Sequence, residues 1–265
     1  MNMGILYIIA TPIGNLEDIT LRALRILKEV DVILCEDTRQ TLKLLNHYGI
    51  SKPLVGYFQH SKISRIEYII DLLKQGRNLA LVTDAGTPGI SDPGGKLVEQ
   101  ISLCVRLLPS DEGRVGRGAD KINYNNNTTP QSPPQLRRGG VDAKIIPIPG
   151  PCAITTGLSI SGFSADKFIF MGFPPHKKGR EKFFKEIAET KYTIVFYESV
   201  HRIMKTLNQL IETRNLTDRQ IVVCRELTKI YESTYRGTAK EVLVSLEQDK
   251  NSIKGEFVVI IHGKK

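Results

Sequence analysis

The chain has 265 residues, of which 41% are hydrophobic and 25% charged, and this composition is typical of a globular protein rather than a disordered one. No stretch approaches the roughly 20 apolar residues of a transmembrane helix, and the N-terminus has no secretory signal pattern, so we expect a cytoplasmic protein without a membrane anchor. The formal net charge of +9 favours a polyanionic partner, and the scattered cysteines argue against a zinc site or a disulfide framework.

The first part of the chain alternates between short β-branched runs and amphipathic helical stretches. Apolar residues recur at helical spacing, as in Leu21, Leu24 and Leu27, between the runs. This pattern predicts a mostly parallel sheet with helices on both faces. The predicted strands are 5–10, 31–35, 54–57, 78–83 and 144–148.

One segment, at about 103–139, interrupts this alternation. It contains GRVGRG, NYNNNTTP and QSPPQLRRGG, lacks apolar periodicity and holds part of the positive charge. Such a composition buries too little apolar surface to offset the entropy of ordering, so we interpret it as a disordered insertion. A phosphate-binding loop or an RNA-binding patch is the alternative for GRVGRG.

The second part resumes the alternation after Pro149, Gly150 and Pro151. The predicted strands are 168–171, 192–197, 220–225, 231–236 and 257–262, and the predicted helices are 178–189, 199–212 and 238–248. Two strands follow each other without a helix and indicate an antiparallel hairpin, so this sheet is expected to be mixed. We therefore predict an N-terminal α/β domain over 1–150 and a C-terminal α/β domain over 151–265.

The loop 84–95, with the sequence DAGTPGISDPGG, follows a predicted buried strand. Glycines allow a ligand to approach the backbone closely, and ligands bind at the carboxyl ends of parallel strands. Without further context, an elaborate turn into the next helix is the alternative. Gly/Pro loops also follow the first and fifth strands, so we expect all three at one edge of the sheet, facing an interdomain cleft. The chain has neither a G-x-G-x-x-G motif nor a P-loop.

Several motifs occur in a specific order along nearly the whole chain outside the insertion. They are TPIGNL at 11–16, EDTR at 36–39, DAGTP and SDPG within 84–95, PGPCA at 149–153, FYES.HR at 196–202, RELTK at 225–229 and KGE at 254–256. In these motifs the chain resembles the bacterial small-subunit ribosomal RNA cytidine-2′-O-methyltransferases, a family of the tetrapyrrole-methylase superfamily. The resemblance implies a two-domain tetrapyrrole-methylase-like fold with the cofactor in the cleft between the domains.

The resemblance also implies the ligands of that cleft. The cofactor would be S-adenosyl-L-methionine, the substrate a cytidine of 16S ribosomal RNA in the 30S subunit, and the protein a homodimer that requires no metal. Family members often have an extra C-terminal helical domain, whereas this sequence stops just past its last predicted strand, so we expect RNA affinity to depend more on the cleft surface. The implied cofactor contacts are Pro12, Asp84, Gly86, Thr87, Ile90, Cys152, Ala153, Tyr197, Glu198 and Gly237.

Candidates for the chemistry follow from the same motifs. Asp37 and Arg39 lie at a strand end and are the catalytic candidates, because a ribose hydroxyl must lose its proton; an ion-paired helix start is the alternative. His60 is a candidate substrate contact, although the family's usual flanking His and Asn are replaced by Gln59 and Ser61. Further RNA contacts are expected from Arg225, Glu226 and Lys229, and from the run Lys177, Lys178, Arg180 and Lys182, for which a solvated helix face is the alternative.

Two other functions remain open from the sequence. One is C-methylation of a tetrapyrrole, the chemistry of superfamily relatives, against which the EDTR and FYES.HR motifs weigh. The other is a catalytically silent module that binds RNA or the cofactor.

Overall fold

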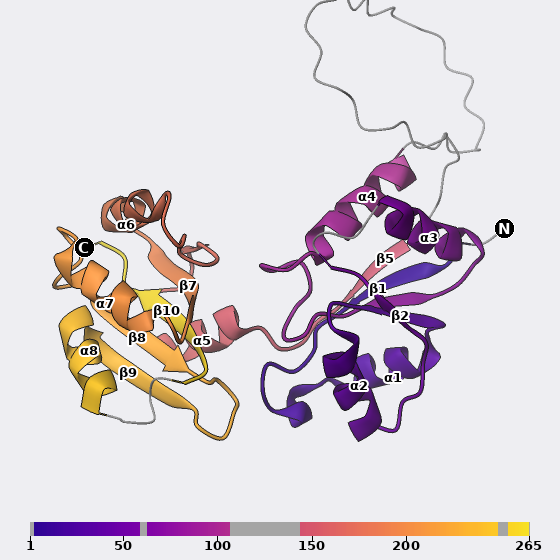
Figure 1. Ribbon diagram of the computed structural model, residues 1–265, viewed down its shortest axis with the longest axis horizontal. Helices are drawn as coiled ribbons and strands as arrows, with labels where there is room; N and C mark the ends of the chain where they lie inside the picture. The colour runs from indigo at the N-terminus through magenta and orange to yellow at the C-terminus, as the bar shows by residue number, and fades with distance from the viewer. Residues whose placement is uncertain (1–2, 59–62, 107–143, 249–253, 265) are drawn as a thin grey trace, which may run out of the picture.

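The computed structural model describes residues 3–58, 63–106, 144–248 and 254–264, which form two five-stranded sheets flanked by helices (Figure 1). His60 and nearly all of the predicted insertion lie outside these residues. Within the described part of the chain, no helix has the length and apolar character needed to cross a membrane.

The first sheet is parallel throughout, as the alternating pattern predicts. Its strand order is β3-β2-β4-β1-β5, and every pairing between neighbours is parallel. The strands are β1 (Ile5–Ile9), β2 (Val32–Cys35), β3 (Leu54–Gly56), β4 (Leu79–Leu81) and β5 (Lys144–Ile148). The loops that follow β4, β1 and β5 therefore leave three adjacent strands at the same edge of the sheet.

Helices cover both faces of this sheet, because successive strand side chains point to opposite sides. Ile9 and Ile33 pack with α1 (Leu21–Glu29) and α2 (Thr38–His47) on one face. Leu6 and Leu34 pack with α3 (Ile63–Lys74) and α4 (Gly94–Arg106) on the other face. Figure 1 shows the two pairs of helices on opposite sides of the sheet. Each such buried aliphatic side chain stabilises the fold by about 1.5–3 kcal/mol relative to an exposed one.

The second sheet is mixed, which is also as predicted. Its order is β6-β7-β10-β8-β9; β6 and β7 are parallel and the remaining pairs antiparallel. The strands are β6 (Phe168–Phe170), β7 (Thr193–Ser199), β8 (Gln220–Arg225), β9 (Ser233–Thr238) and β10 (Glu256–Ile261).

The helices of the second half also divide between two faces of its sheet. One face packs against α6 (Arg180–Glu189), α7 (Ile203–Glu212) and α8 (Ala239–Gln248). The other packs against α5 (Ala153–Ser161), together with Ile13 from the loop after β1. Gly157 allows this close approach, because a Cβ there would lie 3.2 Å from the side chain of Ile260. The first helix after 149–151 therefore belongs to the core of the second sheet.

Element ends differ from the predictions where tertiary pairing decides them. The predicted helix 199–212 begins at Ile203, because Ser199 pairs with Glu256 and completes β7. Helix α4 continues to Arg106, so the first residues of the predicted insertion at about 103–139 are helical. Thr238 and Glu241 form a capping box before α8, since the N–H of Thr238 donates to Oε2 of Glu241 (2.7 Å).

Candidate active site

The three Gly/Pro loops at the carboxyl edge of the first sheet are tied to one another. Thr11 and Gly86 exchange two backbone hydrogen bonds (2.9 and 3.0 Å), and the Thr11 hydroxyl donates to the carbonyl oxygen of Thr83 (3.0 Å). The Thr87 hydroxyl donates to the carbonyl oxygen of Pro151 (3.1 Å). The loops after β1, β4 and β5 thus form one hydrogen-bonded unit at the predicted place.

The loop 84–95 needs its glycines for its backbone path. Gly86 and Gly89 have φ angles of +86° and +90°, in the left-handed region that other residues rarely adopt. The Asp92 carboxylate accepts hydrogen bonds from the N–H groups of Gly89, Ile90 and Gly94 (2.7–3.2 Å), which holds the loop against the start of α4.

The second half provides the opposite wall. It consists of the ends of β7 and β8, the start of β10 and the loop after β6, which together bring Phe173, Tyr197, Leu227 and Glu256 to the site. The wall is joined to the first half where the N–H of Asn15 donates to the Thr228 hydroxyl (3.0 Å). Gly14 is required there, since a Cβ would lie 2.4 Å from Cγ of Lys229.

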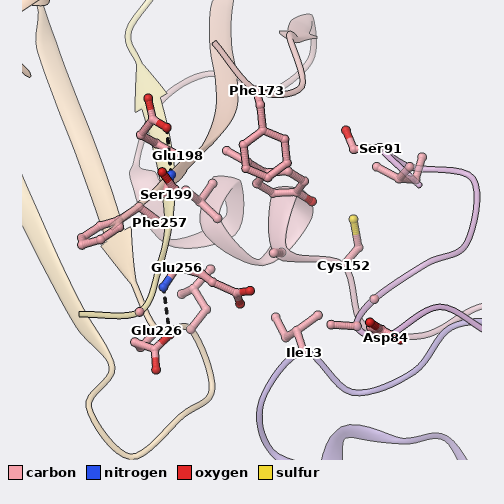
Figure 2. A pocket seen from close by; sticks show the side chains of 18 of the residues that line it. Ile13, Asp84, Ser91, Cys152, Phe173, Glu198, Ser199, Glu226, Glu256 and Phe257 are labelled. Carbon is pink, nitrogen blue, oxygen red and sulfur yellow. Dashed lines mark hydrogen bonds between the residues drawn. The ribbon is translucent and has the colours of Figure 1, made fainter. Parts of the chain in front are cut away.

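Between these walls lies a cavity of about 560 Å³, a size typical of small-molecule sites (Figure 2). Its apolar lining includes Ile13, Ile90, Phe173, Leu227 and Val258. Among the described residues that line it, six are Asp or Glu and one is a cation, Lys229. The pocket therefore combines apolar walls with several carboxylates.

Two of these carboxylates are destabilised as anions. Burial raises the pKa of Glu36 and of Asp84 above their ordinary values, and Asp84 raises that of Glu36 further through charge repulsion. Asp84 is held in place because its Oδ1 accepts the backbone N–H of Asp37 (3.0 Å). A cationic ligand in the pocket would relieve the repulsion between these carboxylates.

Most of the implied cofactor contacts lie in the pocket wall. These are Asp84, Gly86, Thr87, Ile90, Cys152, Ala153, Tyr197 and Glu198. Pro12 and Gly237 are not among the lining residues. Pro12 precedes Ile13, which does line the pocket, and Gly237 lies on the outer strand β9 opposite Ile221. A Cβ on Gly237 would lie 2.6 Å from Oε2 of Glu241, so this glycine serves the start of α8.

Asp37 and Arg39, the catalytic candidates, form the ion-paired helix start that was the alternative. The Asp37 carboxylate accepts the backbone N–H of Arg39 (2.8 Å) as the N-cap of α2, and it pairs with the guanidinium at 2.7 Å. These hydrogen bonds lower the pKa of Asp37 to about 2, which makes it a weak base at neutral pH. Neither residue is among those that line the pocket.

Arg225, Glu226 and Lys229 of the RELTK motif were expected to contact RNA, but in the structure they bind other groups of the protein. Arg225 is only 4% exposed, and its Nε donates to the carbonyl oxygen of Lys254 (2.9 Å). Lys229 donates to Glu226 (2.8 Å) and Glu256 (3.0 Å), and although burial lowers its pKa, these carboxylates raise it above its ordinary value. Glu226 and Lys229 line the pocket as a paired network rather than as free charges.

The cationic run after β6 splits in two. Lys177, Lys178 and Lys182 are exposed, as either a phosphate contact or a solvated face requires. Arg180 is 5% exposed and points into the protein, where its Nη2 donates to the Thr206 hydroxyl (2.7 Å). Its burial leaves it unavailable to a phosphate.

Several pocket residues were missed by sequence reasoning. Ile13, Glu36, Phe173, Leu227 and Glu256 all line the cavity. Glu36 precedes Asp37 in the EDTR motif. Because successive side chains of an extended segment point in opposite directions, the sequence could have indicated that Glu36 and Asp37 face different ways after β2. Leu227 and Glu256 belong to the RELTK and KGE motifs, but these motifs did not indicate the pocket, because only the folding of the second sheet brings the two residues to it.

The chain matches the family model for Tetrapyrrole (Corrin/Porphyrin) Methylases over residues 5–109 and 135–243. Solved structures with a similar fold include a uroporphyrin-III C-methyltransferase from Thermus thermophilus complexed with S-adenosylhomocysteine (TM-score 0.59, 15% identity, 98% of this chain and 97% of that one). A cobalt-precorrin-4 methyltransferase has a TM-score of 0.58 at 19% identity, covering 97% and 94% of the two chains. These identities establish the shared fold alone.

Closer relatives are found among curated proteins named Ribosomal RNA small subunit methyltransferase I. The one from Thermotoga maritima is 39% identical over 99% of this chain and 100% of its own length. The one from Haemophilus influenzae is 41% identical over 98% of this chain and 79% of its own, and the one from Escherichia coli O157:H7 is 38% identical over 100% and 79%. The chain therefore belongs to the tetrapyrrole (corrin/porphyrin) methylase family and is similar over its whole length to members with this ribosomal RNA methyltransferase name.

Proposed function

We propose that this protein transfers a methyl group from S-adenosyl-L-methionine to the 2′-hydroxyl of a cytidine in 16S ribosomal RNA. The relatives at about 40% identity are named as small-subunit ribosomal RNA methyltransferases. The ordered motifs from TPIGNL to KGE support the narrower assignment to a cytidine ribose. One fold neighbour is complexed with S-adenosylhomocysteine, the demethylated product of the proposed cofactor.

The observation that carries the proposal is the character of the pocket. S-adenosylmethionine has an apolar, aromatic adenosine part, a sulfonium cation and an ammonium group. A cavity of about 560 Å³ with apolar walls, and with Glu36 and Asp84 among the carboxylates that line it, suits such a ligand. The same lining disfavours a polyphosphate, which requires several cations or a glycine-rich phosphate cradle.

The pocket residues can be assigned to different parts of the cofactor. We assign Asp84 and Glu36 to the positive charge of the cofactor, and Ile13, Ile90 and Leu227 to its apolar part. When bound, the cofactor supplies a methyl group that already carries its leaving group. The chain then has to align the acceptor oxygen and exclude water, which the two walls of the cavity are placed to do.

The acceptor is assigned from charge and from the relatives rather than from the pocket. The net charge of +9 favours RNA, and the exposed Lys177, Lys178 and Lys182 lie near the start of α6 as candidate phosphate contacts. We further propose the assembled 30S subunit as the substrate, which places the enzyme in the cytoplasm, and a homodimer as the working form.

The test is incubation with radiolabelled S-adenosylmethionine and either 30S subunits, naked ribosomal RNA or a tetrapyrrole precursor, followed by mapping of the label. We expect label on a ribose, detected as a linkage that resists alkaline hydrolysis. Label on a base, or on the tetrapyrrole alone, refutes the proposal. Cofactor binding without any transfer would identify a silent binding module instead.

A matched pair of variants connects the activity to the cavity. Ala153 lines the pocket at the start of α5, whereas Ser159 is exposed on the same helix. Ala153→Phe should abolish labelling by filling the cavity, and Ser159→Phe should leave it unchanged. Equal activity in both variants would show that the cavity is not the cofactor site.

A further inference from the structure

The FYES.HR motif places a charged residue, Glu198, in the pocket wall without directing its charge to the pocket. Its side chain is fully buried, and Figure 2 shows it directed away from Cys152 and Asp84 on the opposite wall. Its Oε2 accepts the Thr206 hydroxyl (2.5 Å), and its Oε1 accepts the N–H of Ser199 (2.8 Å). The carboxylate is therefore committed to groups of its own half.

Two arginines face this carboxylate. Nε of Arg202 lies 3.0 Å from Oε1 of Glu198, and Nη1 of Arg180 lies 3.9 Å from Oε2. Both guanidiniums are largely buried, with side chains 16% and 6% exposed. Buried charges need such partners, because each would otherwise lose its hydration without compensation.

The same arginines bind the loop 172–175, which follows β6. Nη1 of Arg202 donates to the carbonyl oxygen of Pro174 (2.8 Å), and Nη1 of Arg180 donates to that of Pro175 (3.2 Å). Prolines have no N–H, so their carbonyl oxygens are the only backbone groups through which the loop can be held at these positions. The Glu198 carboxylate thus orients both guanidiniums. Arg202 then holds Pro174, and Arg180 holds Pro175.

The residue carried by this loop is Phe173, which lines the pocket while 50% of it is exposed. Its ring packs against Tyr197 (centroids 5.4 Å apart), and the N–H of Tyr197 donates to the carbonyl oxygen of Gly172 (2.8 Å). A half-exposed ring on a short loop has few contacts of its own to hold it. The two carbonyl anchors that follow it hold the other end of its loop.

We propose that Glu198, Arg202 and Arg180 are positioning residues that hold the loop 172–175, so that Phe173 forms the outer wall of the cofactor pocket. The cluster acts through the loop and does not touch the ligand. This inference rests on the proposed function, because it takes the cavity as the cofactor site.

The absence of tryptophan from the sequence allows a direct readout. Phe173→Trp introduces a single indole fluorophore on the loop, and Arg202→Lys is then added to it. Lysine keeps the positive charge beside Glu198 but lacks the fork that reaches Ser199 and Pro174 together. We expect the indole to show lower anisotropy and stronger acrylamide quenching. The dissociation constant for S-adenosylhomocysteine and KM for the cofactor should rise about fivefold, the equivalent of one aromatic contact, with kcat nearly unchanged.

The control is Arg219→Lys in the same Phe173→Trp background. Arg219 is also a partly buried arginine that donates to backbone carbonyls, those of Ile187 (3.0 Å) and Ala188 (2.8 Å), and it does not line the pocket. It should lower the melting temperature without changing the indole fluorescence or the ligand affinity. Glu198→Gln is a second test. Because it leaves the buried guanidiniums of Arg180 and Arg202 without a carboxylate partner and so destabilises the fold, Arg202→Lys is the primary variant.

The outcomes separate the two proposals. Unchanged indole anisotropy in Arg202→Lys overturns the positioning role, and so does a more mobile ring with unchanged affinity. If Phe173→Ala, Phe173→Trp and the unaltered chain all fail to bind S-adenosylhomocysteine, the proposed function fails. A fluorescence change on Arg202→Lys would still support the positioning of the ring in that case.

Discussion

Gly86 offers a sharp test of the pocket, because a matched glycine lies three residues away. Gly86 and Gly89 have nearly the same backbone conformation, with φ angles of +86° and +90°. A Cβ at Gly86 would lie 3.4 Å from Cγ2 of Ile13, and both of these residues line the cavity. A Cβ at Gly89 would have its nearest neighbour at 3.8 Å, on the backbone of Gly95, and Gly89 is not among the lining residues.

Both Gly→Ala substitutions impose the same conformational strain. A residue other than glycine in the left-handed region costs about 1–2 kcal/mol, which for a chain of this size lowers the melting temperature by about 2–8 °C. Only Gly86→Ala adds a methyl group to the pocket wall, 3.4 Å from Cγ2 of Ile13, where it takes space from a bound ligand. We therefore expect Gly86→Ala to weaken S-adenosylhomocysteine binding at least about fivefold, and Gly89→Ala to leave it unchanged.

Circular dichroism measures the melting temperatures, and titration calorimetry measures the dissociation constants at a temperature where both variants are folded. If the two variants lose affinity equally, general loosening of the loop explains the loss. If Gly86→Ala binds normally, the ligand does not meet this part of the wall. The first result would refute a direct contact between Gly86 and the ligand, and the second would refute the assignment of the loop after β4 to the cofactor.

Three further predictions concern charge. Burial raises the pKa of Glu36 in the folded state above its ordinary value of 4.5. Between these two pKa values the folded chain holds more protons than the unfolded chain, so the free energy of unfolding falls as the pH rises through this interval. Glu36→Gln should therefore be more stable than the parent by a margin that grows with pH in thermal melts, while binding the cationic cofactor more weakly; a constant margin contradicts this. Asp37→Asn should retain turnover in the methylation assay, since asparagine is an equally good N-cap, and loss of turnover with normal cofactor binding would restore Asp37 to the mechanism. Replacing Lys177, Lys178 and Lys182 by alanine should reduce the slope of log K against log salt for RNA binding by about 0.7 per lost phosphate contact, whereas Lys28→Ala with Lys74→Ala should not.

Local patterns were sufficient to predict the two sheets. Alternating apolar runs separated by helical periodicity identified the parallel first sheet, and two strands without an intervening helix identified the antiparallel pair in the second. The place of the Gly/Pro loops also followed, because parallel strands end at one edge. These inferences need only neighbours in sequence, which is why they agree with the structure.

The roles of individual charged residues were decided by tertiary structure. Glu36 and Asp37 are adjacent in one motif, yet only Glu36 lines the pocket, while Asp37 caps α2. Arg225 reads as a cation available to RNA until the second sheet buries it.

Glu198 shows most clearly where sequence reasoning ends. Its motif predicted a pocket residue, and Glu198 does line the cavity, but its carboxylate is paired with Arg180 from α6 and Arg202 beside α7. A sequence specifies the type of charge at each position and the face of its own element. Whether that charge meets ligand, solvent or a buried partner depends on which distant elements pack against it, because burial and pairing are properties of the assembled fold.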